Sequence, residues 1–228
     1  MISKLVLEEL YNVKRLSMSE IAQLLSCSVH KVDYWMKAYK IIKRNRSEAN
    51  YIKHNPTGNP FNIKNELNAE ELFLKGLALG IFWGEGNKKN LHSVRVGNTD
   101  PVLIGIFTKF LRTICNVDER KIRFGLQLFT DVDEKLALEF WMKELNISRN
   151  QILPTISRIQ SGKIGTYKSK NHFGVMTVQV NNMKLRDWIV DQIVQISPSS
   201  SVVERIHGRS QEPRPLREEI SERILNNG

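Results

Sequence analysis

Cysteine is scarce in this chain of 228 residues, which has only Cys27 and Cys115. Their separation matches neither a disulfide framework nor a zinc-ligand spacing, and we therefore expect a reducing compartment. Long hydrophobic runs are also missing, since the most apolar stretch, 72–83, contains Lys75 and is too short to span a bilayer. The first residues contain no apolar signal core. These absences predict a cytoplasmic protein that makes no use of a membrane.

Acidic residues are too few to balance the basic ones, and the formal net charge is +10. Residues 1–60 hold ten basic and five acidic residues, residues 61–196 hold nineteen and fourteen, and residues 197–228 hold five of each. The excess of positive charge therefore belongs to two separate modules, residues 1–60 and residues 61–196, and not to the tail. Such an excess favours a polyanionic partner, although a lysine-rich solvated surface gives the same composition.

The first module has the spacing of three helices. Apolar residues recur at helical intervals from Ser3 to Val13, and Ser17 and Ser28 are suited to cap helices over 20–25 and 29–39. A long helix, a short helix, a tight turn and a third helix form the helix-turn-helix arrangement, in which the last helix enters the major groove of DNA. A three-helix adaptor that contacts protein is the alternative.

Residues 16–39 resemble the helix-turn-helix of resolvases and many bacterial regulators, with Ser26 at a turn position where that family usually has Gly. The resemblance implies that Val32 and Trp35 pack inward with Ile21 and Leu25. The residues that it places toward DNA are His30, Lys31, Asp33, Tyr34 and Lys37. In the basic run that follows, 40–46, we expect Arg44 and Arg46 to neutralise phosphates or enter a minor groove.

Proline and glycine gather at 55–60 (NPTGNP), where neither a helix nor a central strand can continue. We expect a helix-turn-helix domain over 1–50, a linker over 51–67 and a second domain over 68–196. The tail, 197–228, begins with a serine- and proline-rich stretch; we expect it to be flexible, with at most a short helix at 217–225.

The second domain opens with a helix over 70–84 that contains three glycines. Gly76, Gly80 and Gly84 recur every four residues and so share one helix face. Each glycine costs a helix about 1 kcal/mol relative to alanine. A bare stripe that admits another helix at close range is a compensation for that cost.

Residues 77–86 (LALGIFWGEG) resemble the motif of the LAGLIDADG homing-endonuclease family. The resemblance makes Glu85 the catalytic acid, gives Mg²⁺ the ligands Glu85 and Gly84, and places Gly76, Gly80 and Gly84 at a dimer interface. Trp83 stands where the family often has Asp. The alternative is a tightly packed structural helix with Gly86 as its C-cap.

The elements that follow support the same resemblance over about 70–196. Residues 94–101 (VRVGNTDP) are expected to form a strand that leads into a helix capped by Asp100, and this helix runs to about residue 114. We expect further strands at 121–129, 152–159 and 173–180, and helices at 133–145 and 183–196. The fold class is then α+β, an all-α domain followed by a mixed domain whose antiparallel sheet forms a saddle on DNA. With one copy of the motif per chain, the resemblance implies a homodimer on a near-palindromic site.

Basic and polar residues on the expected sheet and its loops are candidates for DNA contact. They are Lys88, Lys89, Arg95, Arg123, Gln127, Arg158, Lys163, Lys168 and Lys170. The loop at 161–171 either follows a phosphate backbone or is a solvated hairpin tip. One or more of Lys163, Lys168, Lys170 and Gln127 are expected to support the attacking water.

The sequence therefore predicts a site-specific endonuclease of double-stranded DNA that uses Mg²⁺ and no small-molecule cofactor. A transcription regulator that keeps the scaffold without its nuclease activity is the second hypothesis. It is favoured by Trp83 and by the absence of an identifiable catalytic lysine, whereas the acid at position 85 favours the enzyme. An RNA-splicing maturase is the third.

Overall fold

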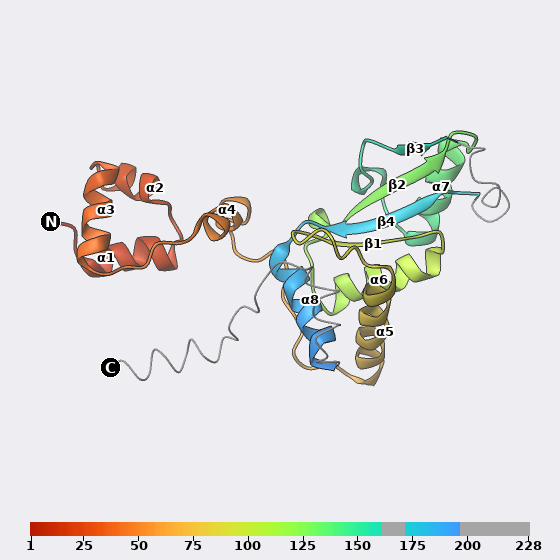
Figure 1. The fold of residues 1–228 in the computed structure, drawn as a ribbon, viewed down its shortest axis with the longest axis horizontal. Coiled ribbons are helices and arrows are strands. Elements are labelled where there is room, and N and C mark those ends of the chain that lie inside the picture. The colour runs from red at the N-terminus through yellow and green to blue at the C-terminus, as the bar shows by residue number, and fades with distance from the viewer. Residues whose placement is uncertain (161–171, 197–228) are drawn as a thin grey trace. The chain divides into compact units, whose positions relative to one another are not determined.

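The computed structural model describes residues 1–160 and 172–196. The chain divides into two compact units, Met1–Pro60 and the part from Phe61 onward, each described by itself below (Figure 1). The described part is mixed α+β, as the sequence predicts. The boundary after Pro60 falls inside the segment expected as a linker.

The first unit is all helical. Its leading elements are α1 (Lys4–Glu8), the π-helical turn η1 (Glu9–Val13), α2 (Met18–Leu24) and α3 (Val29–Ala38). Leu7, Ile21, Val32 and Met36 are fully buried and form its core. Trp35, expected to pack inward, is half-buried against this core. The three predicted helical segments are therefore confirmed.

Serine side chains fix where α2 and α3 begin. The backbone N–H of Glu20 donates to the Ser17 hydroxyl at 3.2 Å, and the N–H of Ser17 donates to the Glu20 carboxylate at 2.7 Å. Ser28 accepts from the N–H of Lys31 at 3.2 Å. In the turn between the helices, Ser26 has a φ of +47°, in the left-handed region that favours glycine.

The segment expected as a linker contributes to both units. Helix α4 (Arg46–His54) crosses the expected domain boundary at residue 50 and buries none of its residues. Residues 61–67 belong to the second unit, because the N–H groups of Asn62 and Lys64 donate to the carbonyls of Cys115 and Ile114 at 3.0 and 2.9 Å. Phe61, Ile63 and Leu67 pack on the same core.

The second unit alternates helices with strands in the predicted order. Its elements are α5 (Ala69–Glu85), β1 (Val94–Asn98), α6 (Pro101–Thr113), the 3₁₀ turn η2 (Glu119–Lys121), β2 (Arg123–Phe129), α7 (Glu134–Leu145), the 3₁₀ turn η3 (Arg149–Gln151), β3 (Ser157–Ile159), β4 (Val175–Val180) and α8 (Met183–Ile196).

The strands form a mixed sheet in the order β1-β4-β2-β3. Strand β4 is antiparallel to both β1 and β2, but β3 runs parallel to β2, so the expectation of a purely antiparallel sheet was wrong. The reason is that α7 returns the chain to the starting end of β2, as a helical crossover between parallel strands does. Strand β3 is also shorter than the predicted 152–159, since Pro154 interrupts it.

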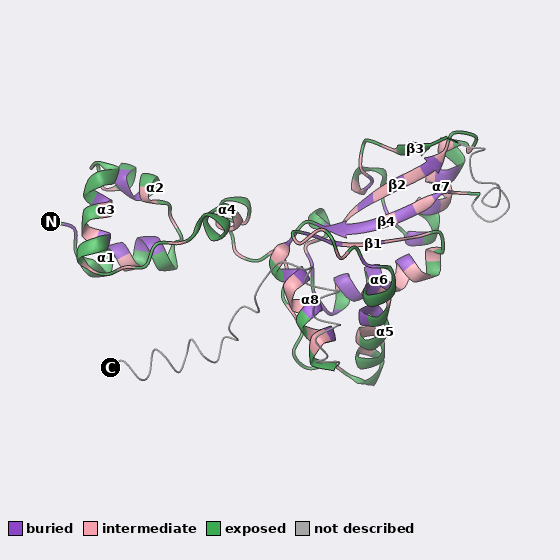
Figure 2. Cartoon of the chain, in the orientation of Figure 1, coloured by how far each residue is buried: buried purple, intermediate pink, exposed green. Residues whose placement is uncertain are grey.

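The core of the second unit lies between one face of the sheet and helices α5, α6 and α8. Alternate residues of β1 and β2 are buried, and α6 alone buries five side chains (Figure 2). The fully buried Trp141 of α7 donates its indole N–H to the carbonyl of Phe173 at 2.7 Å. The inward face is therefore occupied, and the other residues of the strands point to the opposite face.

Candidate functional site: an acidic helix end beside a polar sheet face

Helix α5 carries the candidate acid at its last residue. Asn68 begins the helix with a reciprocal capping box, in which it accepts from the N–H of Glu71 at 2.9 Å. Ala78, Leu79 and Phe82 are buried against the core. Gly86 is the C-cap of the helix, where the backbone becomes extended, and a Cβ at this position would collide with the carbonyl oxygen and the ring of Phe82. This close fit determines where Glu85 stands.

The glycine face of α5 is open within the described residues. A Cβ built at Gly76, Gly80 or Gly84 would meet nothing within 4 Å. The three glycines instead line a groove of about 610 Å³ together with Phe73, Leu77, Ile81 and Glu85. Phe73 is 74% exposed and Leu77 is 40% exposed. The described part of the chain thus supplies no helix that packs on these glycines, which disfavours a purely structural role.

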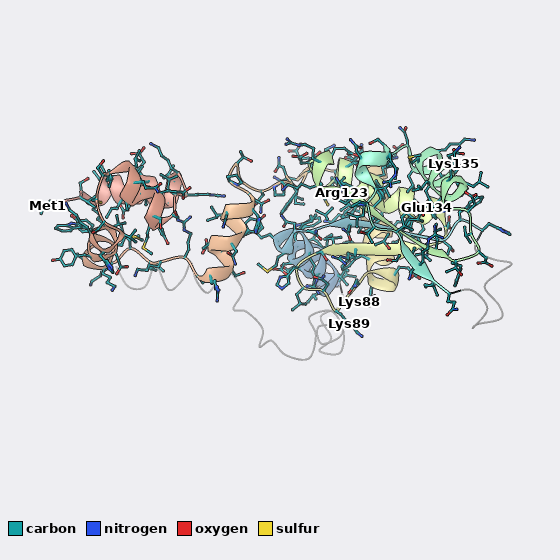
Figure 3. All side chains as sticks on the ribbon, turned by 90° about the horizontal axis from the view of Figure 1, so that it is seen from above. Met1, Lys88, Lys89, Arg123, Glu134 and Lys135 are labelled. Carbon is teal, nitrogen blue, oxygen red and sulfur yellow. The ribbon has the colours of Figure 1, made fainter. Side chains whose placement is uncertain are left out.

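Glu85 is exposed and has one cation held close to it. The Nζ of Lys88 donates to the carbonyl oxygen of Gly84 at 3.0 Å. Partial burial lowers the pKa of Lys88 below its ordinary value, and the charge of Glu85 opposes that shift. Lys88 was expected on the sheet as a DNA contact, and the structure places it at the carboxyl end of α5. Figure 3 shows Lys88 and Lys89 at neighbouring positions, away from Glu134 and Lys135 of α7.

The outer face of the sheet carries a row of polar residues across three strands. Arg95 on β1 is paired with Gln179 on β4, which is paired with Arg123 on β2. Gln179 is only 8% exposed. Gln179 is not predictable from the sequence as a site residue, because an isolated glutamine in an apolar strand gives no signal. The structure brings Arg95 and Arg123 to one row of the sheet.

The next outward row of the sheet contains two glycines. Gly97, Thr177 and Gly125 are paired in register, and the Leu153 side chain lies 3.6 Å from the position of a Cβ at Gly125. A Cβ at Gly97 would lie 2.7 Å from the hydroxyl oxygen of Thr177. Gln127 follows on β2, opposite Val175 and Ser157. The outer face of the sheet therefore carries two arginines on one row and small residues on the next.

Helix α3 presents the polar surface that the sequence predicts. His30, Lys31, Tyr34 and Lys37 are all exposed, and the Tyr34 ring meets Trp35 edge-on at 5.2 Å between centroids. Asp33 is instead bound by two lysines of its own unit, at 2.9 Å from Lys37 and in contact with Lys43. Hydrogen bonds from Lys43 and Lys37 hold the pKa of Asp33 below its usual range.

Arg44 and Arg46 are placed very differently. The Arg44 guanidinium donates to the carbonyls of Arg15, at 2.9 Å, and Leu16, and it lies 4.0 Å from the centroid of the Tyr11 ring. These contacts hold the chain after α3 against the start of the unit, so Arg44 has a structural role where a phosphate contact was expected. Arg46 is exposed at the first position of α4.

Of the remaining residues predicted to contact DNA, one forms an ion pair within its own unit and three lie outside the described residues. Arg158 binds Glu134 at 2.6 Å. Lys163, Lys168 and Lys170, the loop at 161–171 and the tail at 197–228 all lie outside the described residues.

The donor atoms at the end of α5 suit a hard divalent cation, but only in part. Mg²⁺ prefers oxygen and is usually held by one or two carboxylates together with substrate phosphates. The Glu85 carboxylate and the Gly84 carbonyl oxygen are such donors. Within residues 1–160 and 172–196 there is no cluster of three or more His, Cys, Asp or Glu placed to hold a metal ion. A second copy of Glu85 would complete a two-carboxylate set.

In the described ranges no helix combines the length and the apolar character needed to cross a membrane.

Comparisons of the chain with protein-family models, with curated proteins and with solved structures find no match.

Proposed function

We propose that this chain is a magnesium-dependent, site-specific endonuclease of double-stranded DNA that acts as a homodimer, of the LAGLIDADG type and with a helix-turn-helix module at its N-terminus. The observation that carries the proposal is the open glycine face of α5, which ends at the exposed carboxylate of Glu85. The polar face of the sheet and the exposed residues of α3 support it independently.

The occupant of the groove on α5 is a second copy of the same helix. Three helical glycines cost about 1 kcal/mol each, and nothing within 4 Å in the described chain compensates for them. Two copies packed side by side and parallel about a two-fold axis bury Phe73 and Leu77 and bring the two Glu85 residues together. An antiparallel pair would instead place the Glu85 carboxylate beside the apolar Phe73. The parallel pair is therefore favoured.

The paired acids give the dimer its chemistry. When bound, Mg²⁺ neutralises the charge that develops on a scissile phosphate and lowers the pKa of water. The Glu85 carboxylates and the Gly84 carbonyl oxygens are the groups of this chain that would hold it. Each protomer contributes one acid, and the site is incomplete without its partner.

Two surfaces are available for duplex DNA. Arg95 and Arg123 lie on one row of the outer face of the sheet, with Gln179 between them. Lys31 and Tyr34 are exposed on α3, the helix that occupies the recognition position of the helix-turn-helix pattern. Two DNA-binding units on one chain raise the effective concentration of each at the site.

A transcription regulator built on the same scaffold is the second candidate. Trp83 favours it, since this residue is 41% exposed next to Glu85 and presents an indole where the family often has a carboxylate. Both candidates bind duplex DNA, and only the nuclease cleaves it.

The experiment begins by selecting, from random duplexes, the DNA that the full chain retains. That DNA is then incubated with the wild type, Glu85→Gln and Glu70→Gln in Mg²⁺ or in EDTA. Glu70 is an exposed acid in the first turn of the same helix and is the matched control. We expect cleavage in Mg²⁺ by the wild type and by Glu70→Gln, and binding without cleavage by Glu85→Gln. Binding without cleavage by the wild type would establish the regulator, and failure to retain any duplex would overturn both candidates.

A further inference from the structure

The chain segment that follows α5 is fixed onto the sheet. Gly86 forms an antiparallel bridge with Val96, and the N–H of Asn87 donates to the carbonyl of Arg95 at 2.9 Å. The Asn87 side-chain oxygen then accepts from the N–H groups of Lys89 and Asn90 at 3.0 and 3.1 Å. The backbone around Lys88 is therefore determined by β1 and by a local asparagine turn.

A buried arginine reaches the same segment from α8. Arg186 is 1% exposed, and its Nη2 donates to the carbonyl of Lys88 at 3.4 Å, while Nη1 lies 3.7 Å from the Asp187 carboxylate. Burying a guanidinium is costly unless it is paired and hydrogen-bonded. The hydrogen bond from the buried Arg186 guanidinium to the carbonyl of Lys88 therefore favours a fixed backbone at Lys88 over a freely moving surface segment.

The fixed backbone directs the Lys88 side chain back to the end of α5. Its Nζ donates to the carbonyl oxygen of Gly84 at 3.0 Å, at the helix end that carries partial negative charge. The Glu85 carboxylate acts on the same ammonium group. Lys89, the next residue, is exposed. Lys88 is thus placed on the Gly84 oxygen, one of the two groups that the proposed function assigns to the metal.

This arrangement matters most in a dimer. Two carboxylates brought to one site repel each other unless cations lie nearby. In the proposed dimer, two Glu85 carboxylates and two Lys88 ammonium groups add to zero charge. Without Lys88, the free dimer would carry two uncompensated negative charges at its axis.

We propose that Lys88 neutralises the paired Glu85 carboxylates while the homodimer holds no divalent ion, so that the dimer assembles before metal and DNA bind. The proposal rests on the homodimer of the proposed function and not on cleavage. It makes Lys88 a positioning residue for assembly. Because Lys88 occupies the Gly84 oxygen, it must leave that oxygen in the loaded dimer.

Sedimentation equilibrium of the full chain tests this role. The wild type, Lys88→Met, Lys88→Arg and Lys89→Met are compared in EDTA and in Mg²⁺, with circular dichroism to verify that each is folded. In EDTA we expect Lys88→Met to weaken dimerisation about tenfold, which corresponds to about 1.4 kcal/mol. Lys88→Arg and Lys89→Met are expected to stay within about twofold of the wild type, and Mg²⁺ is expected to restore Lys88→Met.

A second pair of variants isolates the charge effect. Adding Glu85→Gln to Lys88→Met removes the repulsion, and we expect the double variant to dimerise in EDTA as the wild type does. Equal dimerisation of Lys88→Met and the wild type in EDTA would overturn the proposal, as would a wild type that stays monomeric in both solutions. A wild type that dimerises but never cleaves DNA would remove the nuclease and leave the role of Lys88 intact.

Discussion

Phe82 occupies, with its carbonyl oxygen and its ring, the space that a side chain at Gly86 would need. This contact lies directly after Glu85, and the main-chain N–H of Gly86 donates to that same carbonyl at 2.9 Å. The end of α5 is therefore determined by the lack of a single Cβ. Any change there moves the candidate acid and the segment that carries Lys88.

Gly86→Ala is expected to destabilise the second unit. Overpacking a close contact costs about 1–3 kcal/mol, and Phe82 cannot move away because it is 1% exposed. Urea denaturation of the full chain measures the change. Gly105→Ala in α6 is the matched control, since the nearest atom to a Cβ there is 3.9 Å away and the residue lies outside the proposed dimer face. If both variants lost stability equally, the contact with Phe82 would not be the cause.

Gly80→Ala is expected to raise the folding stability of the chain and to weaken its self-association. An alanine there should stabilise α5 by up to about 1 kcal/mol, the difference in helix propensity, but it should weaken self-association because its methyl group enters the glycine face. Thermal denaturation and sedimentation measure the two effects. Gly105→Ala in α6, where the nearest atom to a Cβ is 3.9 Å away on Leu145, should give the first effect alone. Unchanged association in Gly80→Ala would contradict a dimer through this face.

Lys31→Ala and Tyr34→Ala in α3 test whether the N-terminal unit binds DNA and distinguishes among DNA sequences. Loss of one phosphate-binding lysine should lower affinity at every sequence and reduce the salt dependence of binding by about one unit of slope. Tyr34→Ala should instead alter the preference among sequences. Titration of labelled duplexes at several salt concentrations measures both. Lys14→Ala, which removes an exposed lysine paired with Glu9, is the control; an equal effect of that variant would argue against α3.

The stability of the first unit is expected to fall in acid through Glu20. Hydrogen bonds from Ser17 hold the pKa of Glu20 below its ordinary value in the folded unit. Because the unfolded chain has the higher pKa, this stabilisation is complete above the ordinary carboxyl range and is lost as the pH falls through the folded value. Urea titrations followed by the amide NMR signals of α2 and α3 measure it. Glu20→Gln keeps the capping geometry without a titrating group, so its pH profile should be flatter.

Features encoded by neighbouring residues are predictable from the sequence. Ser17, Ser28 and Asp100 begin helices because each side chain accepts from backbone N–H groups two or three residues ahead. The fourfold spacing of the glycines places them on one face of α5 for the same local reason. The order of helices and strands and the exposure of Glu85 at the end of that face needed no long-range information.

The tertiary structure decided what depends on contacts between distant segments. Strand β3 pairs with β2 in parallel because α7 returns the chain to the starting end of β2. The guanidinium of Arg44 donates to carbonyls that lie nearly thirty residues away in the sequence. Gln179 meets Arg95 and Arg123 only through strand register. Lys88 likewise is one lysine among many in the sequence, and its Nζ is directed to the Gly84 oxygen by a backbone that β1 and Arg186 hold in place. Local hydrogen bonds determine the elements, whereas their packing determines which charges meet.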